Sequence, residues 1–301
     1  MWLPVFACPV CHGPLDGQVG EMLACPRCEL RFDRRGGIFR FLTPSLERAA
    51  EPFLRQYRTV REHDGYRSTS AQYYRMLPYV PPDDPQAAEW RLRRESYAHL
   101  LRDALPLDAS PALRVLDVGS GCGWLSHRLA TLGHHAVAVD RIDDEADGLG
   151  AYRHYEVAFA AVQADFDHLP FQAAQFDLVV FEGVLHYAPD PAATLTEAGR
   201  VLVPGGSLVV MDSPVFARDA DGEAMMTDLL RRLRAAHTLP AVIRPGVGFL
   251  TYHGMDAAFG RLGMKARFVR SWGPFTWRVR RELARFRLGR EPAAFGVWIA
   301  N

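Results

Sequence analysis

Four cysteines near the start of the chain are paired in a way that indicates a metal site. Cys8 and Cys11 form one CxxC motif, Cys25 and Cys28 form a second, and thirteen residues separate the two pairs. Each motif brings two thiolates onto one tight turn, so the two motifs together supply the four sulfur ligands of a tetrahedral Zn²⁺. Because such a site leaves no position for water, we expect a structural role. Two disulfides or four unrelated buried thiols are the alternatives, and this spacing favours zinc.

A glycine-rich turn follows an apolar run and precedes a helical pattern. Gly119, Gly121 and Gly123 alternate with other residues, which lets the backbone approach a ligand closely, and Ser120 lies between the first two. Asp117 precedes the first glycine, so the motif is DxGxGxG and not the GxGxxG of dinucleotide sites. A carboxylate at this position repels a pyrophosphate but can bind the ammonium of an amino-acid ligand. The motif therefore favours S-adenosylmethionine (SAM) over NAD.

Acidic residues close the apolar runs that follow this turn. Asp140 ends the second run, about 20 residues after the glycines, where a carboxylate can hold ribose hydroxyls. Asp165 ends the third run beside Phe166, a pair that can bond an adenine amino group and pack on its ring. Glu182 closes the fourth run and is assigned to the same ligand. One such acid is usually a helix cap, but open α/β sheets bind ligands at the carboxyl ends of successive strands.

His186 is the candidate catalytic residue. A hydroxyl or amine that accepts a methyl group must lose a proton, and a side chain with a pKa near neutrality suits that task. His186 follows the fourth apolar run by a few residues, where the chain should emerge beside the ligand. The alternative is that His186 packs beneath the loop as a structural donor. His253 and Tyr74 are reserve candidates.

The elements that must position these residues alternate between strand and helix from Arg114 onward, a pattern typical of βαβ units and a parallel sheet. The predicted strands are Arg114–Val118, Ala136–Asp140, Ala161–Ala164, Asp177–Phe181, Ser207–Met211, Ala266–Arg270 and Phe295–Ala300. The predicted helices are Trp124–Leu132, Pro191–Leu202 and Met255–Leu262, and a Pro204–Gly206 turn leads into the fifth strand.

The order of these features, from Arg114 to about Asp212, resembles the class I SAM-dependent methyltransferases, especially the ubiquinone/menaquinone-biosynthesis group. The matching segments include Asp177-Leu178-Val179-Val180, Leu185-His186-Tyr187 and Leu202-Val203-Pro204-Gly205-Gly206. The resemblance implies an α/β, Rossmann-like sheet of seven strands with the last strand antiparallel. It also implies SAM contacts from Gly119, Gly121, Asp140 and Asp165, but it does not specify the methyl acceptor.

The segment from Phe6 to Leu42 resembles the zinc ribbon of tRNA-methyltransferase activator proteins. The matching segments are Ala7–Cys11, Gly13–Leu15, Leu23–Cys28 and Gly37-Ile38. That family implies binding to a methyltransferase, and here the ribbon is fused to one. A further protein partner for the ribbon remains open.

Three regions are predicted. Residues 1–43 form the zinc ribbon, 44–110 a helical extension, and 111–301 the SAM domain with lid insertions at about 213–249 and 272–291. The extension either covers the active site or packs as core. The apolar stripe in the first insertion indicates core, and the arginines of the second indicate a solvated helix face more than a phosphate site.

Composition limits the functional classes. The chain has 301 residues, 49% of them hydrophobic, and 35 basic residues balance 35 acidic ones. Zero net charge argues against a nucleic-acid binder. The sequence shows neither a membrane-spanning run nor a signal peptide, so we expect a cytoplasmic protein.

We therefore expect an enzyme that methylates a small molecule at oxygen, nitrogen or carbon. The first alternative is an RNA methyltransferase, since bacterial rRNA guanine methyltransferases resemble this layout with an N-terminal four-cysteine ribbon. The second alternative is a non-catalytic scaffold of the same fold, which the intact glycine and acid motifs disfavour.

Overall fold

The computed structural model describes residues 2–19, 21–66, 68, 70–105, 112–237, 243–244 and 246–301. The predicted boundary between the helical extension and the SAM domain, in the segment 106–111, lies outside these residues. Part of the first predicted insertion, 238–242 together with residue 245, also lies outside them.

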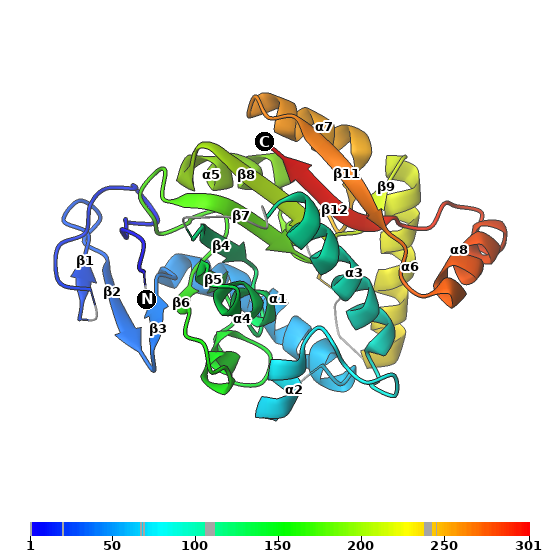
Figure 1. Cartoon of the computed structure of the whole chain (residues 1–301), viewed down its shortest axis with the longest axis horizontal. Coiled ribbons are helices and arrows are strands. Elements are labelled where there is room, and N and C mark those ends of the chain that lie inside the picture. The colour runs from blue at the N-terminus through cyan, green and yellow to red at the C-terminus, as the bar shows by residue number, and fades with distance from the viewer. Residues whose placement is uncertain are drawn as a thin grey trace.

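A single ten-stranded sheet organises the molecule, with strand order β1-β2-β3-β6-β5-β4-β7-β8-β12-β11 (Figure 1). The predicted seven-stranded sheet is confirmed within it, and β12 is antiparallel to both of its neighbours. Its strands are β4 (Arg114–Val118), β5 (His135–Asp140), β6 (Ala160–Gln163), β7 (Phe176–Glu182), β8 (Leu202–Met211), β11 (Ala266–Ser271) and β12 (Phe295–Ala300). The carboxyl ends of β4 to β7 therefore meet at one edge of the sheet.

Helices follow the strands as the sequence predicts. They are α4 (Trp124–Thr131), α5 (Pro191–Val201) and α7 (Tyr252–Arg261), with short 3₁₀ turns η1 (Leu149–His154) and η2 (Leu185–Tyr187). Asp190 begins α5 because its carboxylate accepts from the backbone N–H groups of Ala192 and Ala193. The predicted Pro204–Gly206 turn lies inside β8, where the pairing with β7 shifts register.

The zinc-ribbon segment is joined to the central sheet, which the sequence does not anticipate. Its strands are β1 (Leu23–Ala24), β2 (Arg31–Arg35) and β3 (Ile38–Arg40). β3 pairs in parallel with β6, so Phe39 lies opposite Val162. The Phe6 ring lies 4.9 Å from that of Phe41 and 5.9 Å from that of Phe171, between ring centroids. The ribbon and the sheet domain therefore share one hydrophobic core.

The helical extension consists of α1 (Pro44–His63), α2 (Ala71–Met76) and α3 (Ala87–Asp103). Thr43 begins α1 because its hydroxyl accepts from the Leu46 N–H at 3.3 Å. α3 packs on β11 and β12. The buried Ser96 hydroxyl of α3 lies 2.8 Å from that of Ser271 and donates to Asp212 at 2.6 Å. These bonds fix α3 against the sheet.

The first insertion forms β9 (Val215–Phe216), α6 (Asp219–His237) and β10 (Leu250–Thr251). Met226 of α6 packs with Phe216 and Phe249 in a small buried cluster, so the predicted apolar stripe is partly core. The second insertion forms α8 (Phe275–Leu288). Within the described residues, no helix combines the length and the apolar character needed to cross a membrane.

Candidate functional site

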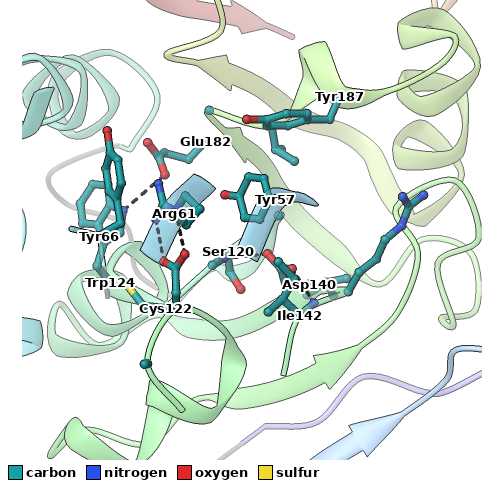
Figure 2. A pocket seen from close by; sticks show the side chains of 18 of the residues that line it. Tyr57, Arg61, Tyr66, Ser120, Cys122, Trp124, Asp140, Ile142, Glu182 and Tyr187 are labelled. Atoms are coloured by element: carbon teal, nitrogen blue, oxygen red, sulfur yellow. Dashed lines mark hydrogen bonds and ion pairs between the residues drawn. The ribbon is translucent and has the colours of Figure 1, made fainter. Parts of the chain in front are cut away.

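A cavity lies at the carboxyl ends of β4, β5, β6 and β7 and encloses about 1100 Å³, its open mouth included. Figure 2 shows Tyr57 of α1, Asp140 at the end of β5 and Glu182 at the end of β7 around this cavity. Ten of its lining residues, from Phe53 to Arg93, come from the helical extension. The three helices of the extension therefore form one wall of the cavity, and the strand ends form another.

The glycine turn forms the floor. Gly119 has φ +70°, and a β-carbon on it would lie 2.4 Å from a methyl of Val184, so only glycine fits there. Gly121 has φ +53° with open space where a side chain would be. The Ser120 hydroxyl also lines the cavity and is buried without a hydrogen-bond partner in the described part of the chain. The turn thus offers its backbone and one unpaired hydroxyl to a ligand.

Asp140 is held in place by two backbone N–H groups. Its Oδ2 accepts from Gly121 and its Oδ1 from Ile142, both at 2.8 Å. Burial raises its pKa. The carboxylate therefore lies beside the glycine turn, held by two backbone N–H groups.

Asp117 lies beneath the turn and does not line the cavity. Its Oδ2 accepts from the Ser126 N–H at 3.0 Å and from the Ser126 hydroxyl at 2.7 Å, and burial raises its pKa to about 7. Gly123 is likewise beneath, where a β-carbon would lie 2.8 Å from the Phe159 ring. One carboxylate oxygen of Asp117 thus holds the first turn of α4, and Oδ1 is buried without a hydrogen-bond partner among the described residues. The contact of Asp117 with a ligand ammonium stays a prediction.

Asp165 also turns away from the cavity, whereas Phe166 lines it. One carboxylate oxygen pairs with Arg141 and the other accepts from the Asp167 N–H at 2.8 Å. Arg141 itself lines the cavity, with its guanidinium carbon 4.8 Å from the centre of the Phe166 ring. The sequence analysis missed Arg141, although its place directly after Asp140 is a signal.

Glu182 lines the cavity and is held from two directions. Trp124 donates its indole N–H at 3.3 Å, and the Arg93 Nε lies 3.1 Å away. Arg93 reaches the cavity, whereas its neighbour Arg94 is exposed. A one-residue step on a helix turns the side chain by about 100°, which separates the two.

A second ion pair, between Arg61 and Asp147, lies in the lining of the cavity. Arg61 of α1 donates to both oxygens of Asp147, at 2.7 and 2.6 Å (Figure 2). Its guanidinium also lies 3.7 Å from the centre of the Tyr66 ring. Tyr57 and Tyr187 meet edge to face nearby, with ring centroids 6.0 Å apart.

His186 is not among the residues that line the cavity. Its Nδ1 lies 3.1 Å from the Ser213 hydroxyl, and desolvation lowers its pKa to about 4. An imidazole with that pKa is a weak base, so its placement and pKa favour the alternative in which His186 is a structural donor. Of the reserve candidates, His253 is exposed, and Tyr74 lines the cavity but donates its hydroxyl to the Ala146 carbonyl at 2.6 Å.

The four cysteines converge on one point. Their sulfur atoms all lie within 4.8 Å of one another, and the Sγ atoms of Cys11 and Cys25 are 3.6 Å apart. A zinc tetrahedron with Zn–S bonds of ~2.3 Å has edges of ~3.8 Å, so the sulfurs fit this metal. The Cys28 N–H donates to the Cys25 sulfur at 3.3 Å. These four cysteines form no disulfide in the described part of the chain, so the two-disulfide alternative is not seen there.

Comparison with known proteins identifies the sheet domain. Residues 116–210 match the family described as "Methyltransferase domain". This segment runs from β4 through β8 and contains the glycine turn, Asp140 and Glu182. The chain therefore carries a methyltransferase domain of the class I fold.

Individual relatives agree with this class. A malonyl-(acyl-carrier protein) O-methyltransferase of Hahella chejuensis is 36% identical over 118 residues, covering 38% of this chain and 39% of the relative. A ubiquinone biosynthesis O-methyltransferase of Xylella fastidiosa is 36% identical over 102 residues, covering 32% and 40%. The chain thus spans about two fifths of the length of these relatives.

One solved structure extends the similarity in fold over more of the chain. Magnesium protoporphyrin IX methyltransferase from Synechocystis PCC 6803, solved with bound SAH, has a TM-score of 0.51 and 15% identity. The match covers 83% of this chain and 98% of that protein. At this identity the likeness concerns the fold alone.

Proposed function

We propose that this chain is a SAM-dependent methyltransferase that acts on a small molecule. The observation that carries the proposal is the glycine turn, pinned by Asp140 and open to a cavity at the carboxyl ends of the parallel strands. In this proposal Gly119, Gly121 and Ser120 hold the amino-acid part of SAM, Asp140 its ribose and Phe166 its adenine. Glu182 lies beside the same pocket through its bonds to Trp124 and Arg93.

SAM supplies a methyl group already activated by the neighbouring sulfonium, so the protein contributes chiefly by positioning the acceptor. The helical extension is suited to this task because its aromatic side chains enclose the cavity: Phe53, Tyr57, Tyr66, Tyr73, Tyr74 and Trp90. We infer that α1 to α3 form the acceptor side of the site. The bond network around Ser96 and the Arg61–Asp147 pair hold these helices in place.

Aromatic walls favour an apolar or aromatic acceptor over an RNA chain. The lining contains few charged groups, and two of its cations, Arg61 and Arg93, are already paired with Asp147 and Glu182. The zero net charge of the chain supports the same choice. The O-methyltransferase names of the relatives support a hydroxyl or carboxyl acceptor.

We further propose that Cys8, Cys11, Cys25 and Cys28 hold one structural zinc. The proposal is supported by the 3.6 Å separation between the Cys11 and Cys25 sulfurs. Thiolates that hold zinc persist in a reducing compartment, so the proposal includes a cytoplasmic location. The metal would fix the turns that precede β1 and β2, and through β3 it would support the edge of the central sheet.

Mass spectrometry of ligands released from the denatured, purified protein tests the proposed function. We expect SAM or its demethylated product in amounts comparable to the protein, together with any small acceptor that co-purifies. Release of bound RNA in place of these compounds, with retention that falls as salt increases, would support the RNA alternative. A protein that carries no SAM and does not take it up on addition would support the non-catalytic scaffold.

A further inference from the structure

Helix α8 projects from the body at the end of the molecule opposite the zinc-ribbon strands (Figure 1). It carries several large apolar side chains that face solvent. Phe275 is 75% exposed and Phe286 is 86% exposed, and Val279 and Leu283 are exposed as well. Single exposed apolar residues are ordinary, but four on one short helix require an explanation.

These four residues form one continuous stripe. They follow one another at intervals of four, four and three residues, and successive residues of an α-helix are rotated by about 100°, so the stripe spans about 80° of the helix circumference. The opposite side is the one attached to the protein. Trp277 and Arg281 lie there, both partly buried, and Arg281 donates to the Ala293 carbonyl. The attachment of α8 therefore turns the apolar stripe outward.

Arginines flank the stripe on both sides. At the same angular step, Arg280 and Arg287 lie along one border, and Arg278 and Arg285 along the other. All four are exposed. Of the four, Arg285 also pairs with Glu291 at 3.1 Å, beyond the end of the helix. This arrangement, an apolar stripe between two cationic borders, is typical of helices that lie in a membrane interface.

We propose that α8 binds this protein to an anionic phospholipid surface. Phe275, Val279, Leu283 and Phe286 enter the boundary between headgroups and acyl chains. The long arginine side chains reach back to the phosphates, with their apolar stems along the lipid. A nucleic acid would pair with the arginines but would leave the apolar stripe in water, and charge complementarity favours the lipid over a neutral apolar partner.

Helix α8 is connected to the wall of the cavity through α3. Glu95 of α3 accepts from the Trp272 N–H at 2.9 Å and from the Gly273 N–H at 2.8 Å, which fixes the segment that leads into α8. The same helix α3 supplies Trp90 and Arg93 to the cavity. A protein bound to the membrane surface through α8 would therefore hold its aromatic cavity close to the lipid, where apolar acceptors concentrate.

Vesicle flotation tests this inference and needs neither SAM nor an acceptor, so its outcome is independent of the proposed methyl transfer. We expect the full chain to float with vesicles of phosphatidylcholine and phosphatidylglycerol, and much less with phosphatidylcholine alone or at high salt. The double variant Phe275→Ser/Phe286→Ser should lower the partition constant about tenfold or more. Arg280→Gln/Arg287→Gln should lower it less and reduce its salt dependence.

Leu132→Ser is the matched control, since Leu132 is an exposed apolar residue that lies elsewhere, at the end of α4. It should bind vesicles like the parent, and the unfolding curves of all variants should coincide. Absence of flotation, or equal flotation of the parent and the Phe double variant, would overturn the proposal. So would a stripe-dependent dimer that forms without lipid binding, or RNA binding that displaces the protein from vesicles and survives loss of both Phe residues.

Discussion

The carboxylate of Asp140 and the backbone N–H of Gly121 are joined by a hydrogen bond of 2.8 Å. This bond connects the end of β5 to the glycine turn after β4, and a second bond from Ile142 fixes the other carboxylate oxygen. Two adjacent strand ends are thereby locked into one rigid corner of the cavity. The corner is formed entirely by groups of the protein.

Replacement of Asp140 tests the role of this corner. Asp140→Ala removes the acceptor for two backbone N–H groups and for a ligand hydroxyl, so SAM affinity should fall about a hundredfold. Asp140→Asn keeps one acceptor oxygen and should lose less. The measurement is calorimetric titration with SAM, with the exposed Asp256→Ala on α7 as the control. Parental affinity in Asp140→Ala would remove this residue from the site.

Loss of the proposed zinc should affect the whole protein and not the ribbon alone. The sequence suggests an independent unit, but β3 pairs with β6, and Phe6 packs against Phe171 in the common core. We therefore expect Cys11→Ser to lower the free energy of unfolding by about 4 kcal/mol or more. Elemental analysis should find one zinc per chain in the parent.

Urea unfolding followed by two probes distinguishes destabilisation of the whole protein from loss of the ribbon alone. Tryptophan fluorescence reports the sheet domain and far-ultraviolet circular dichroism reports the helices, and in Cys11→Ser both should shift together to lower urea. Unchanged unfolding of the sheet domain in that variant would mean that the ribbon folds as a separate unit.

His186→Ala should retain turnover within about threefold of the parent, because His186 lies outside the cavity and its pKa is about 4. The sequence-based hypothesis of a catalytic base requires instead a loss of about a hundredfold. Initial rates across pH, once an acceptor is known, separate the two. Loss of an inflection near neutrality, together with low turnover, would restore the catalytic assignment.

His186 also predicts a pH dependence of stability. Its pKa is about 4 in the folded protein and 6.5 in the unfolded chain, so between these values the unfolded state binds more protons. His186 therefore contributes a loss of stability as pH falls from 6.5 toward 4. His186→Ala should show a shallower decline over this window in urea unfolding, whereas Ala replacement of the exposed His253 should leave the slope unchanged.

The Arg61–Asp147 pair should show coupling that an exposed pair lacks. Both side chains are largely buried and are joined by two hydrogen bonds. A double-mutant cycle with Arg61→Ala and Asp147→Ala should give a coupling energy of about 1–3 kcal/mol in urea unfolding. The exposed pair Arg55–Glu51 is the control and should give less than about 0.5 kcal/mol. Equal coupling in the two cycles would contradict a special role for the cavity pair.

The sequence predicts the order of the sheet domain well because each element carries its own local signal. The apolar run of β4, the glycine turn and the acid that ends β5 are all read within a few residues. β3 has only three residues, so its pattern is too short to predict its pairing with β6, which lies more than a hundred residues later in the chain.

Side-chain direction is the part that local pattern does not specify. Asp117 and Asp165 are correctly placed at strand ends, but the first points to Ser126 and the second to Arg141. The α8 stripe had a visible helical period, yet only the attachment through Trp277 and Arg281 determines which face meets solvent. These outcomes depend on contacts between segments far apart in the chain.

Calorimetric titration of the purified full-length protein with SAM tests the central claim most directly. We predict one SAM site per chain, competition by its demethylated product, and loss of most of the affinity in Asp140→Ala while the variant remains folded. A well-folded protein that gives no binding heat at several temperatures would contradict it, as would SAM binding that Asp140→Ala leaves unchanged.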